Sequence, residues 1–217
     1  MEIIKLGEKE APEVLKITDL KQGVRNRERV NVYVNNEFSF SLDISQVVDL
    51  KIKVGRVISD SEFEEFKRAS EFGKLYQRAL EWVLVRPRSE KEVRDYLYKK
   101  IFEKKLDKKY IDLIIEKLRA KKYLDDYRFS EYYVENRFLK KGISKKRLQM
   151  ELFKKGIKKE IVEEVLSGSD RNDIDEIKKI IAKKRDKYTD EKLIQYLCRQ
   201  GFLFELSQEL VRSYGKD

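Results

Sequence analysis

Histidine is absent from this chain of 217 residues, and cysteine occurs once, at Cys198. Without histidine the chain has neither a Ser–His–Asp nor a Cys–His catalytic arrangement, and one cysteine supplies neither an internal disulfide nor a zinc site. We expect Cys198 to be a small core residue rather than a reactive thiol. The P-loop and the glycine-rich dinucleotide-binding motif are also missing. These absences predict a protein that is not an enzyme, with no catalytic residue, cofactor or metal ion.

Long apolar runs are missing as well. No stretch approaches the roughly 20 apolar residues that span a bilayer, and residues 1–5 lack the basic start and long apolar stretch of a signal peptide. We therefore expect a cytoplasmic protein that does not contact a membrane. Charged and hydrophobic residues each make up 41% of the chain, a balance that predicts a folded protein rather than a disordered one.

One pattern occurs three times: a hydroxyl residue, an aliphatic residue four positions later, and Leu four positions after that. The copies are Ser89/Val93/Leu97, Ser144/Leu148/Leu152 and Thr189/Leu193/Leu197. Spacings of four place the apolar residues on one helix face, and the hydroxyl residue suits a helix N-cap. Two copies have Gly twelve positions after the hydroxyl residue, Gly156 and Gly201, whereas the first has Ile101 there. Since Gly commonly ends a helix, the pattern predicts one helix with a defined start and end, used as an internal repeat.

Apolar stripes at helical spacing flank each copy, so we expect three helices in each repeat. The predicted fold is mainly α: a tandem array of three three-helix repeats at residues 74–122, 123–168 and 169–217. A small β-rich module with a linking helix, residues 1–73, precedes the array. A single repeat buries little apolar surface, so we expect the repeats to stack into an elongated, curved array. A basic insertion at residues 102–109 lengthens the first repeat.

The module at residues 1–73 carries a strand pattern. Apolar and polar residues alternate over residues 30–34 and 38–42, on either side of Asn35 and Asn36. Asn tolerates the positive φ of a tight turn, so this pattern predicts a β-hairpin. We expect an earlier strand over residues 15–20, a short helix over residues 44–50, and a linking helix that begins at Ser59–Glu62.

The net charge of +10 is concentrated in the centre of the chain. Residues 74–168 contain 27 Lys and Arg against 16 Asp and Glu; residues 1–73 contain 12 against 14, and residues 169–217 contain 11 against 10. A basic centre favours nucleic acid or an acidic protein surface as the partner. The alternative is a solvated Lys/Glu-rich surface of the kind that thermophiles use, which accounts less well for the local excess.

Two local motifs have alternative interpretations. Each helix–Gly–helix corner resembles a helix-turn-helix, but the helix after Gly156 carries Glu160, Glu163 and Glu164, whose carboxylates would repel phosphate. Sequence-specific DNA binding is therefore disfavoured. The adjacent carboxylates of Asp125 and Asp126 suggest a metal or acid/base site. We favour a structural role, in which one caps the following helix and the other interacts with the positive end of that helix.

Five short segments occur in a particular order: Arg-Pro-Arg-Ser-Glu at 86–90, Tyr-Leu-Asp-Asp with Arg-Phe at 123–129, Lys-Gly-Ile-Ser at 141–144, Lys-Gly at 155–156 and Arg-Gln-Gly-Phe at 199–202. Their order and spacing, over about residues 74–214, resemble those of the regulatory protein RecX family. The β-rich module is similar to an extension found in part of that family. The family's usual Gly after the first patterned helix is missing, because Ile101 stands in its place.

The resemblance implies a modulator of the RecA recombinase in DNA repair, recombination and the SOS response. Family members bind within the groove of the RecA filament on single-stranded DNA and typically inhibit its ATPase and strand exchange; double-stranded DNA is a further candidate partner. The cations that we expect to contact RecA or DNA are Arg86, Arg88, Lys121, Lys122, Arg128, Arg137, Lys140, Lys141, Lys145, Lys146, Arg147, Lys154 and Lys155.

Two other functions remain open. A general basic DNA-binding protein without a RecA partner would use some of the 12 Tyr and 11 Phe residues as stacking platforms, although most of them lie on stripes expected in the core. A protein-only scaffold would have no effect on DNA. The sequence has no long heptad seam, so we expect a monomer.

Overall fold

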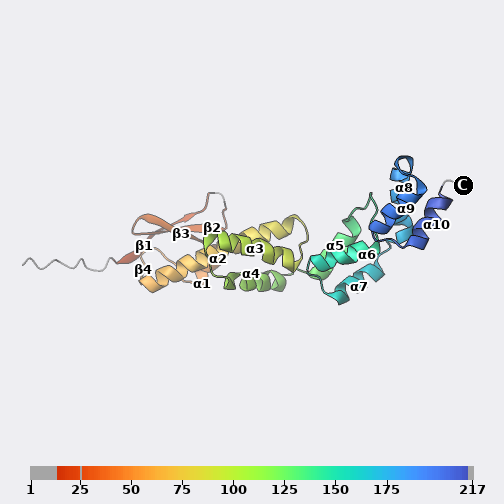
Figure 1. The fold of residues 1–217 in the computed structure, drawn as a ribbon. Helices are drawn as coiled ribbons and strands as arrows, with labels where there is room; N and C mark the ends of the chain where they lie inside the picture. Colours follow the sequence, from red (N-terminus) through yellow and green to blue (C-terminus); the bar gives the residue numbers. More distant parts are fainter. Residues whose placement is uncertain (1–13, 25, 215–217) are drawn as a thin grey trace, which may run out of the picture. The chain divides into compact units, whose positions relative to one another are not determined.

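The chain is mainly helical, with a small antiparallel sheet near its N-terminal end (Figure 1). A computed structural model describes residues 14–24 and 26–214. The chain forms two compact units that divide between Arg78 and Ala79, within helix α2 (Asp60–Val85). The expected fold class, a helical array after a β-containing module, is confirmed. Helix α2 also continues through residues 73 and 74, where the sequence suggested a boundary.

The sheet of the first unit contains β1 (Leu15–Gln22), β2 (Arg29–Val34), β3 (Glu37–Asp43) and β4 (Val57–Ile58). Their order is β3-β2-β1-β4, and neighbouring strands are antiparallel. Asn35 and Asn36 join β2 to β3 with φ values of 52° and 69°, so the expected hairpin is confirmed. Strand β4 was not expected, because two residues are too few to show an alternating pattern.

The core of the first unit joins the sheet to α2. Its buried side chains are Ile17, Val32, Val34, Phe40, Leu42, Ile52, Ile58 and Phe66. Helix α1 (Ile44–Asp49) follows β3, as expected, and Asp43 and Gln46 form a capping box at its start. The side-chain amide of Gln46 also donates a hydrogen bond of 2.8 Å to the carbonyl of Ala69, which ties α1 to α2.

The second unit consists of the end of α2 and the helices that follow it. These are α3 (Glu90–Lys104), α4 (Lys109–Ala120), α5 (Asp126–Asn136), α6 (Lys145–Lys154), α7 (Lys159–Gly168), α8 (Asp173–Lys184), a 3-10 turn η1 (Arg185–Lys187), α9 (Asp190–Arg199) and α10 (Phe204–Ser213). Helices α5–α7, here the second repeat, and α8–α10, here the third repeat, each enclose a core of their own. The first repeat ends with α3 and α4. Among the described residues, no helix is long and apolar enough to cross a membrane.

The three hydroxyl residues of the sequence pattern are N-caps, as expected. Ser89, Ser144 and Thr189 each accept a hydrogen bond from the backbone amide three positions later, at the start of α3, α6 and α9. The aliphatic and Leu residues of the pattern are fully buried in all three helices. The repeated sequence pattern therefore corresponds to the second helix of each repeat.

Glycine ends two of these helices, also as expected. Gly156 after α6 has a φ of 80°, and the next residue, Ile157, donates its amide to the carbonyl of Leu152 at 3.2 Å. Gly201 after α9, with a φ of 92°, is followed by the same turn. This pair of features is the usual left-handed end of a helix.

Lys105 has the same role after α3 that glycine has after α6 and α9. Its φ is 53°, and the amide of Leu106 donates to the carbonyl of Ile101 at 3.1 Å. Lys105 lies sixteen positions after Ser89, whereas Gly156 lies twelve after Ser144. The first repeat therefore has one extra helical turn in α3, and the missing glycine is explained by this insertion.

Candidate functional site

Helix α6 begins against the third repeat. The carboxylate of Asp173, the first residue of α8, accepts a hydrogen bond of 2.9 Å from the backbone amide of Lys145. The hydroxyl of Ser144 donates to the carbonyl of Gln200 at 2.7 Å, and accepts from the amide of Arg147 at 3.1 Å. These contacts place Arg147 at the border of the two repeats, where its guanidinium donates to the side chain of Gln200.

A cavity of about 500 Å³ lies at this border. The described residues that line it are Phe138, Lys141, Gly142, Arg147, Ile180, Lys183, Lys184, Lys187, Tyr196 and Gln200. Five of them are Lys or Arg, and none is acidic. They come from the loop before α6, from α6 itself and from α8, η1 and α9, so folding brings together cations that lie far apart in the sequence.

The five cations of the cavity are poorly neutralised. Within the described part of the chain, only Arg147 forms an ion pair, with Glu151 at 3.3 Å. Lys184 lies over the ring of Tyr196 at 4.5 Å, and Lys183 donates to the carbonyl of Lys140. Like charges held together in this way raise the local positive potential, which favours a polyanion.

A second cavity, of about 310 Å³, shares Arg147 and Gln200 with the first. Its lining adds the exposed cations Lys146, Lys154 and Arg199. Glu151 is the acidic residue in this lining, and it is already paired. We call the two cavities together the basic cleft. The cleft contains four of the cations expected from the sequence, which are Lys141, Lys146, Arg147 and Lys154.

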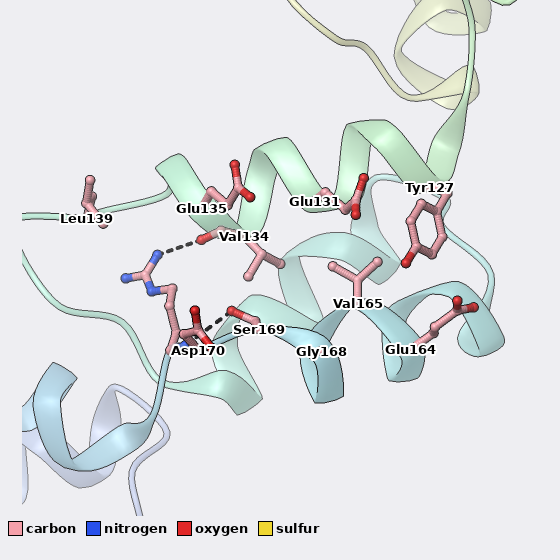
Figure 2. A pocket seen from close by; sticks show the side chains of 11 residues that line it. Tyr127, Glu131, Val134, Glu135, Leu139, Glu164, Val165, Gly168, Ser169 and Asp170 are labelled. Atoms are coloured by element: carbon pink, nitrogen blue, oxygen red, sulfur yellow. Dashed lines mark hydrogen bonds between the residues drawn. The ribbon is translucent and has the colours of Figure 1, made fainter.

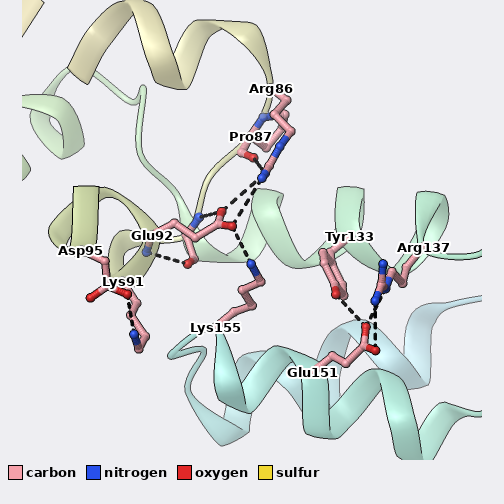
Figure 3. Close-up of polar contacts among 10 residues, drawn as sticks. Arg86, Pro87, Lys91, Glu92, Asp95, Tyr133, Arg137, Glu151 and Lys155 are labelled. Atoms are coloured by element: carbon pink, nitrogen blue, oxygen red, sulfur yellow. Dashed lines mark hydrogen bonds and ion pairs between the residues drawn. The ribbon is translucent and has the colours of Figure 1, made fainter. Parts of the chain in front are cut away.

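Five other expected cations are used within the protein. Arg137 pairs with Glu151, and Arg88 lies 3.9 Å from the centre of the Trp82 ring. The ammonium of Lys145 donates to the carbonyl of Leu166 at 3.1 Å. Arg86 and Lys155 both pair with Glu92 (Figure 3). The remaining four are exposed and lie outside the lining of the cleft: Lys121, Lys122, Arg128 and Lys140.

Glu92 joins the first repeat to the second (Figure 3). One of its carboxylate oxygens lies 2.6 Å from the ammonium of Lys155 and 3.3 Å from the guanidinium of Arg86. Glu92 also closes the capping box of Ser89. Burial raises the pKa of Glu92, but hydrogen bonds from Lys155 and Arg86 outweigh burial and hold that pKa below its usual value. Lys155 is therefore a structural cation.

Glu151 forms a second cluster in Figure 3, within the second repeat. It accepts hydrogen bonds from the hydroxyl of Tyr133 at 2.7 Å and from the guanidinium of Arg137 at 2.6 Å. Burial would raise the pKa of Glu151, yet the hydrogen bonds from Arg137 and Tyr133 lower it to about 2. Glu151 therefore stays charged and keeps Arg137 and Arg147 in place beside the cleft.

Four cleft cations were not expected from the sequence: Lys183, Lys184, Lys187 and Arg199. They belong to residues 169–217, whose charges nearly balance. The sequence does contain a local basic run, Lys-Lys-Arg-Asp-Lys at residues 183–187. The net charge summed over the whole repeat does not show this run.

An acidic cavity of about 370 Å³ lies between α5 and α7 (Figure 2). Glu131 and Glu135 of α5 and Glu164 of α7 line it together with the apolar side chains of Val134 and Val165. Arg171, the one cation among the described residues of this lining, is already paired with Glu176. The carboxylates would repel phosphate, so this cavity does not suit a polyanion. In the described residues, no group of three or more His, Cys, Asp or Glu side chains is placed to hold a metal ion.

The neighbouring aspartates 125 and 126 both have structural partners, and the expected cap of the following helix is confirmed at Asp125. Asp125 is the N-cap of α5 and accepts hydrogen bonds from the amides of Tyr127 and Arg128. Asp126 accepts from the amide of Glu90 at 2.8 Å and so contacts α3 of the preceding repeat.

Comparisons with known proteins agree on one family. A model described as the regulatory protein RecX N-terminal domain matches residues 15–59, and one described as the RecX second three-helix domain matches residues 125–166. The regulatory protein RecX of Bacillus licheniformis is 30% identical over 198 residues, which cover 88% of this chain and 74% of that protein. That of Listeria welshimeri is 29% identical over 202 residues, covering 89% and 74%.

Solved structures show the same fold. A crystal structure of regulatory protein RecX matches with a TM-score of 0.70 and 20% identity, over 92% of this chain and 99% of that one. The crystal structure of RecX from Lactobacillus salivarius matches with a TM-score of 0.51 and 25% identity, over 67% and 97%. The relatives carry the name of regulatory proteins rather than of enzymes.

Proposed function

Since this chain belongs to the RecX family of regulatory proteins, we propose that it modulates the RecA recombinase by binding the RecA filament on single-stranded DNA. The modulation proposed is inhibition of ATP hydrolysis and of strand exchange. The basic cleft is the observation that supports this function, because it gathers eight cations around one carboxylate that is already paired.

The cleft suits a nucleoprotein filament for two physical reasons. Cations that contact phosphates release condensed counterions, which gives binding energy that falls as salt rises. The cleft is also built between two repeats whose contacts fix its shape, through Asp173 with Lys145 and Ser144 with Gln200. A monomer with several repeats can contact neighbouring protomers of a filament at once, so weak individual contacts are sufficient.

The proposal is tested by RecA ATP hydrolysis on single-stranded DNA, with the protein added well below one molecule per RecA protomer. We expect the unaltered protein to inhibit hydrolysis. The cleft variant Lys141→Glu/Lys183→Glu/Lys187→Glu should lose most of this inhibition, and the slope of filament affinity against salt should fall by about one for each phosphate contact removed.

The matched control is Lys53→Glu/Lys178→Glu/Lys192→Glu, which makes the same change of charge at exposed lysines outside the cleft and outside the expected contacts. The control should inhibit as the unaltered protein does. Equal loss in both variants would mean that only net charge matters, and full inhibition by the cleft variant would exclude the cleft as the contact.

A general DNA-binding protein without a RecA partner is the second candidate. Phe138 and Tyr196 line the cleft beside its lysines, an arrangement that suits single-stranded DNA. This function predicts steep salt dependence on free DNA and no preference for the RecA filament. Parallel binding measurements on free and RecA-coated DNA of the same length separate the two.

A further inference from the structure

The end of helix α3 exposes two aromatic rings one helical turn apart. Phe102 is 76% exposed and Tyr98 is 50% exposed. A spacing of four residues places both on one face of the helix. They line a cavity of about 350 Å³ together with Ile101, Lys105, Leu106 and Lys108. We call Tyr98, Lys99, Phe102, Lys105 and Lys108 the α3 patch.

The exposure of Phe102 follows from the extra turn of α3. Counted from the N-cap, Phe102 corresponds to Ile157 and Phe202, which are each 4% exposed in the cores of the other repeats. In the first repeat the helix continues, and Leu106 takes the position of Ile157 and Phe202 after the left-handed residue. The inserted turn therefore carries Phe102 to the surface, next to the buried Ile101, and Tyr98 lies one turn before it on α3.

The patch is also basic. Residues 98–109 contain six lysines and two carboxylates. Both carboxylates are already paired, Glu103 with Lys100 and Asp107 with Lys109. Lys99, Lys105 and Lys108 are exposed and form no ion pair among the described residues. The ammonium of Lys108 lies 5.6 Å from the centre of the Tyr98 ring.

We propose that the α3 patch binds single-stranded DNA directly, at a site separate from the basic cleft. Bases stack on the rings of Tyr98 and Phe102, while Lys99, Lys105 and Lys108 contact the phosphates on either side. Exposed rings flanked by lysines match the two parts of a nucleotide, its flat base and its charged phosphate, and such stacking does not depend on sequence. An acidic protein would use the lysines but has less need of exposed rings. This inference goes beyond the proposed function, because it assigns a second DNA-binding surface outside the basic cleft.

The test compares Tyr98→Ala/Phe102→Ala with the unaltered protein in fluorescence anisotropy, using a labelled oligothymidine strand without RecA. Base stacking on aromatic rings contributes to affinity for a single strand, so we expect that affinity to fall about tenfold or more. A duplex of the same length should bind with little change, since its bases are already stacked. Tyr98→Phe/Phe102→Tyr, which keeps both rings, should bind as the unaltered protein does.

The control Tyr123→Ala/Phe204→Ala removes two exposed rings outside the patch and should not change the affinity. A strand with abasic sites should bind equally to the unaltered protein and to Tyr98→Ala/Phe102→Ala, because it has no base to stack. Undiminished binding of oligothymidine by that variant would overturn the proposal. An equal loss of affinity for the single strand and for the duplex would also overturn it. Binding of polyglutamate serves as the probe for an acidic protein partner, and a loss of affinity seen with polyglutamate alone would indicate such a partner instead of DNA.

Failure of this inference is distinguishable from failure of the proposed function. The anisotropy measurement contains no RecA, and the ATP hydrolysis measurement uses variants of the cleft. A protein that inhibits RecA but binds single strands equally with and without the two rings would refute the α3 patch alone.

Discussion

The carboxylate of Asp173 accepts a hydrogen bond of 2.9 Å from the backbone amide of Lys145. Asp126 makes the same contact with the amide of Glu90 at 2.8 Å. In both cases the aspartate is the first residue of one repeat's first helix, and the amide is that of the first residue in the preceding repeat's second helix. The first amides of a helix have no partner within it. Each repeat therefore helps to cap the helix of the one before.

Removing one of these contacts should weaken the border that forms the basic cleft. We expect Asp173→Ala to lower the free energy of unfolding by about 1 kcal/mol, the usual cost of losing a helix cap. Asp173→Asn, which keeps an oxygen acceptor, should lose less. Urea unfolding followed by circular dichroism measures both. Asp186→Ala, an exposed aspartate in η1, is the control, and equal midpoints for Asp173→Ala and the control would contradict the capping role.

The contribution of Asp126 to the stability of the protein should depend on pH. Burial raises the pKa of Asp126 to about 6, against an opposing effect of Arg119. A carboxyl group whose pKa is raised on folding stabilises the folded state below its unfolded pKa of about 4, and this contribution is lost as the pH rises through about 6. Asp126→Asn cannot titrate at this position. The stability of the unaltered protein should therefore fall relative to that of Asp126→Asn as the pH rises from 4 to 7.

Chemical unfolding at several pH values across that range tests this. If Asp126→Asn and the unaltered protein differed by the same amount at pH 4 and pH 7, the group would not titrate on folding, and the prediction would be wrong.

Glu92 should matter more to stability than an exposed carboxylate on the same helix. Its side chain is 14% exposed and contacts two cations and the start of α3. Glu92→Gln removes the charge and leaves Lys155 and Arg86 without their partner, at a cost of about 1–3 kcal/mol. Glu103→Gln, which breaks one exposed pair with Lys100, should cost much less. Thermal unfolding of the two variants side by side decides this, and similar losses would contradict it.

Local signals explain how much of the fold was predictable. The N-caps at Ser89, Ser144 and Thr189 and the left-handed Gly156 and Gly201 depend on neighbours within one helix, and the structure confirms all five. Hairpin formation at residues 35–36 depends on equally local chemistry. The residues that form each of these features lie within a few positions of one another, so sequence patterns predict them.

Long-range pairing explains what was not predictable at the site. Lys155 meets Glu92, 63 residues away, and Arg147 meets Gln200, 53 residues away. Lys155 and Lys154 are adjacent and chemically alike, yet only Lys154 lines the basic cleft. Whether a given lysine can contact a partner molecule depends on the side chains that lie beside it in the folded protein. Counting charges along the sequence does not identify those neighbours.

Gly201 offers a test of how closely the second and third repeats pack. A Cβ atom at this position would lie 2.8 Å from the hydroxyl oxygen of Ser144, and the φ of 92° disfavours any side chain. Gly55 has a similar φ of 88° with open space around it. We expect Gly55→Ala to cost about 1 kcal/mol from backbone strain, and Gly201→Ala about 1–3 kcal/mol more from the clash. Equal losses in denaturant unfolding would mean that the border can relax without cost.

Lys105 has a left-handed backbone conformation at the position where the other two repeats have glycine, and this conformation should lower the stability of the protein. Its left-handed φ of 53° costs a side-chain-bearing residue about 1 kcal/mol relative to glycine. We therefore expect Lys105→Gly to raise the stability of the protein by about 0.5–1 kcal/mol, despite the greater freedom of glycine in the unfolded chain. Lys105→Ala removes the same charge but keeps the Cβ atom, so it should give no such gain. A gain of equal size in both variants would assign the effect to charge repulsion among the lysines of the α3 patch rather than to the backbone.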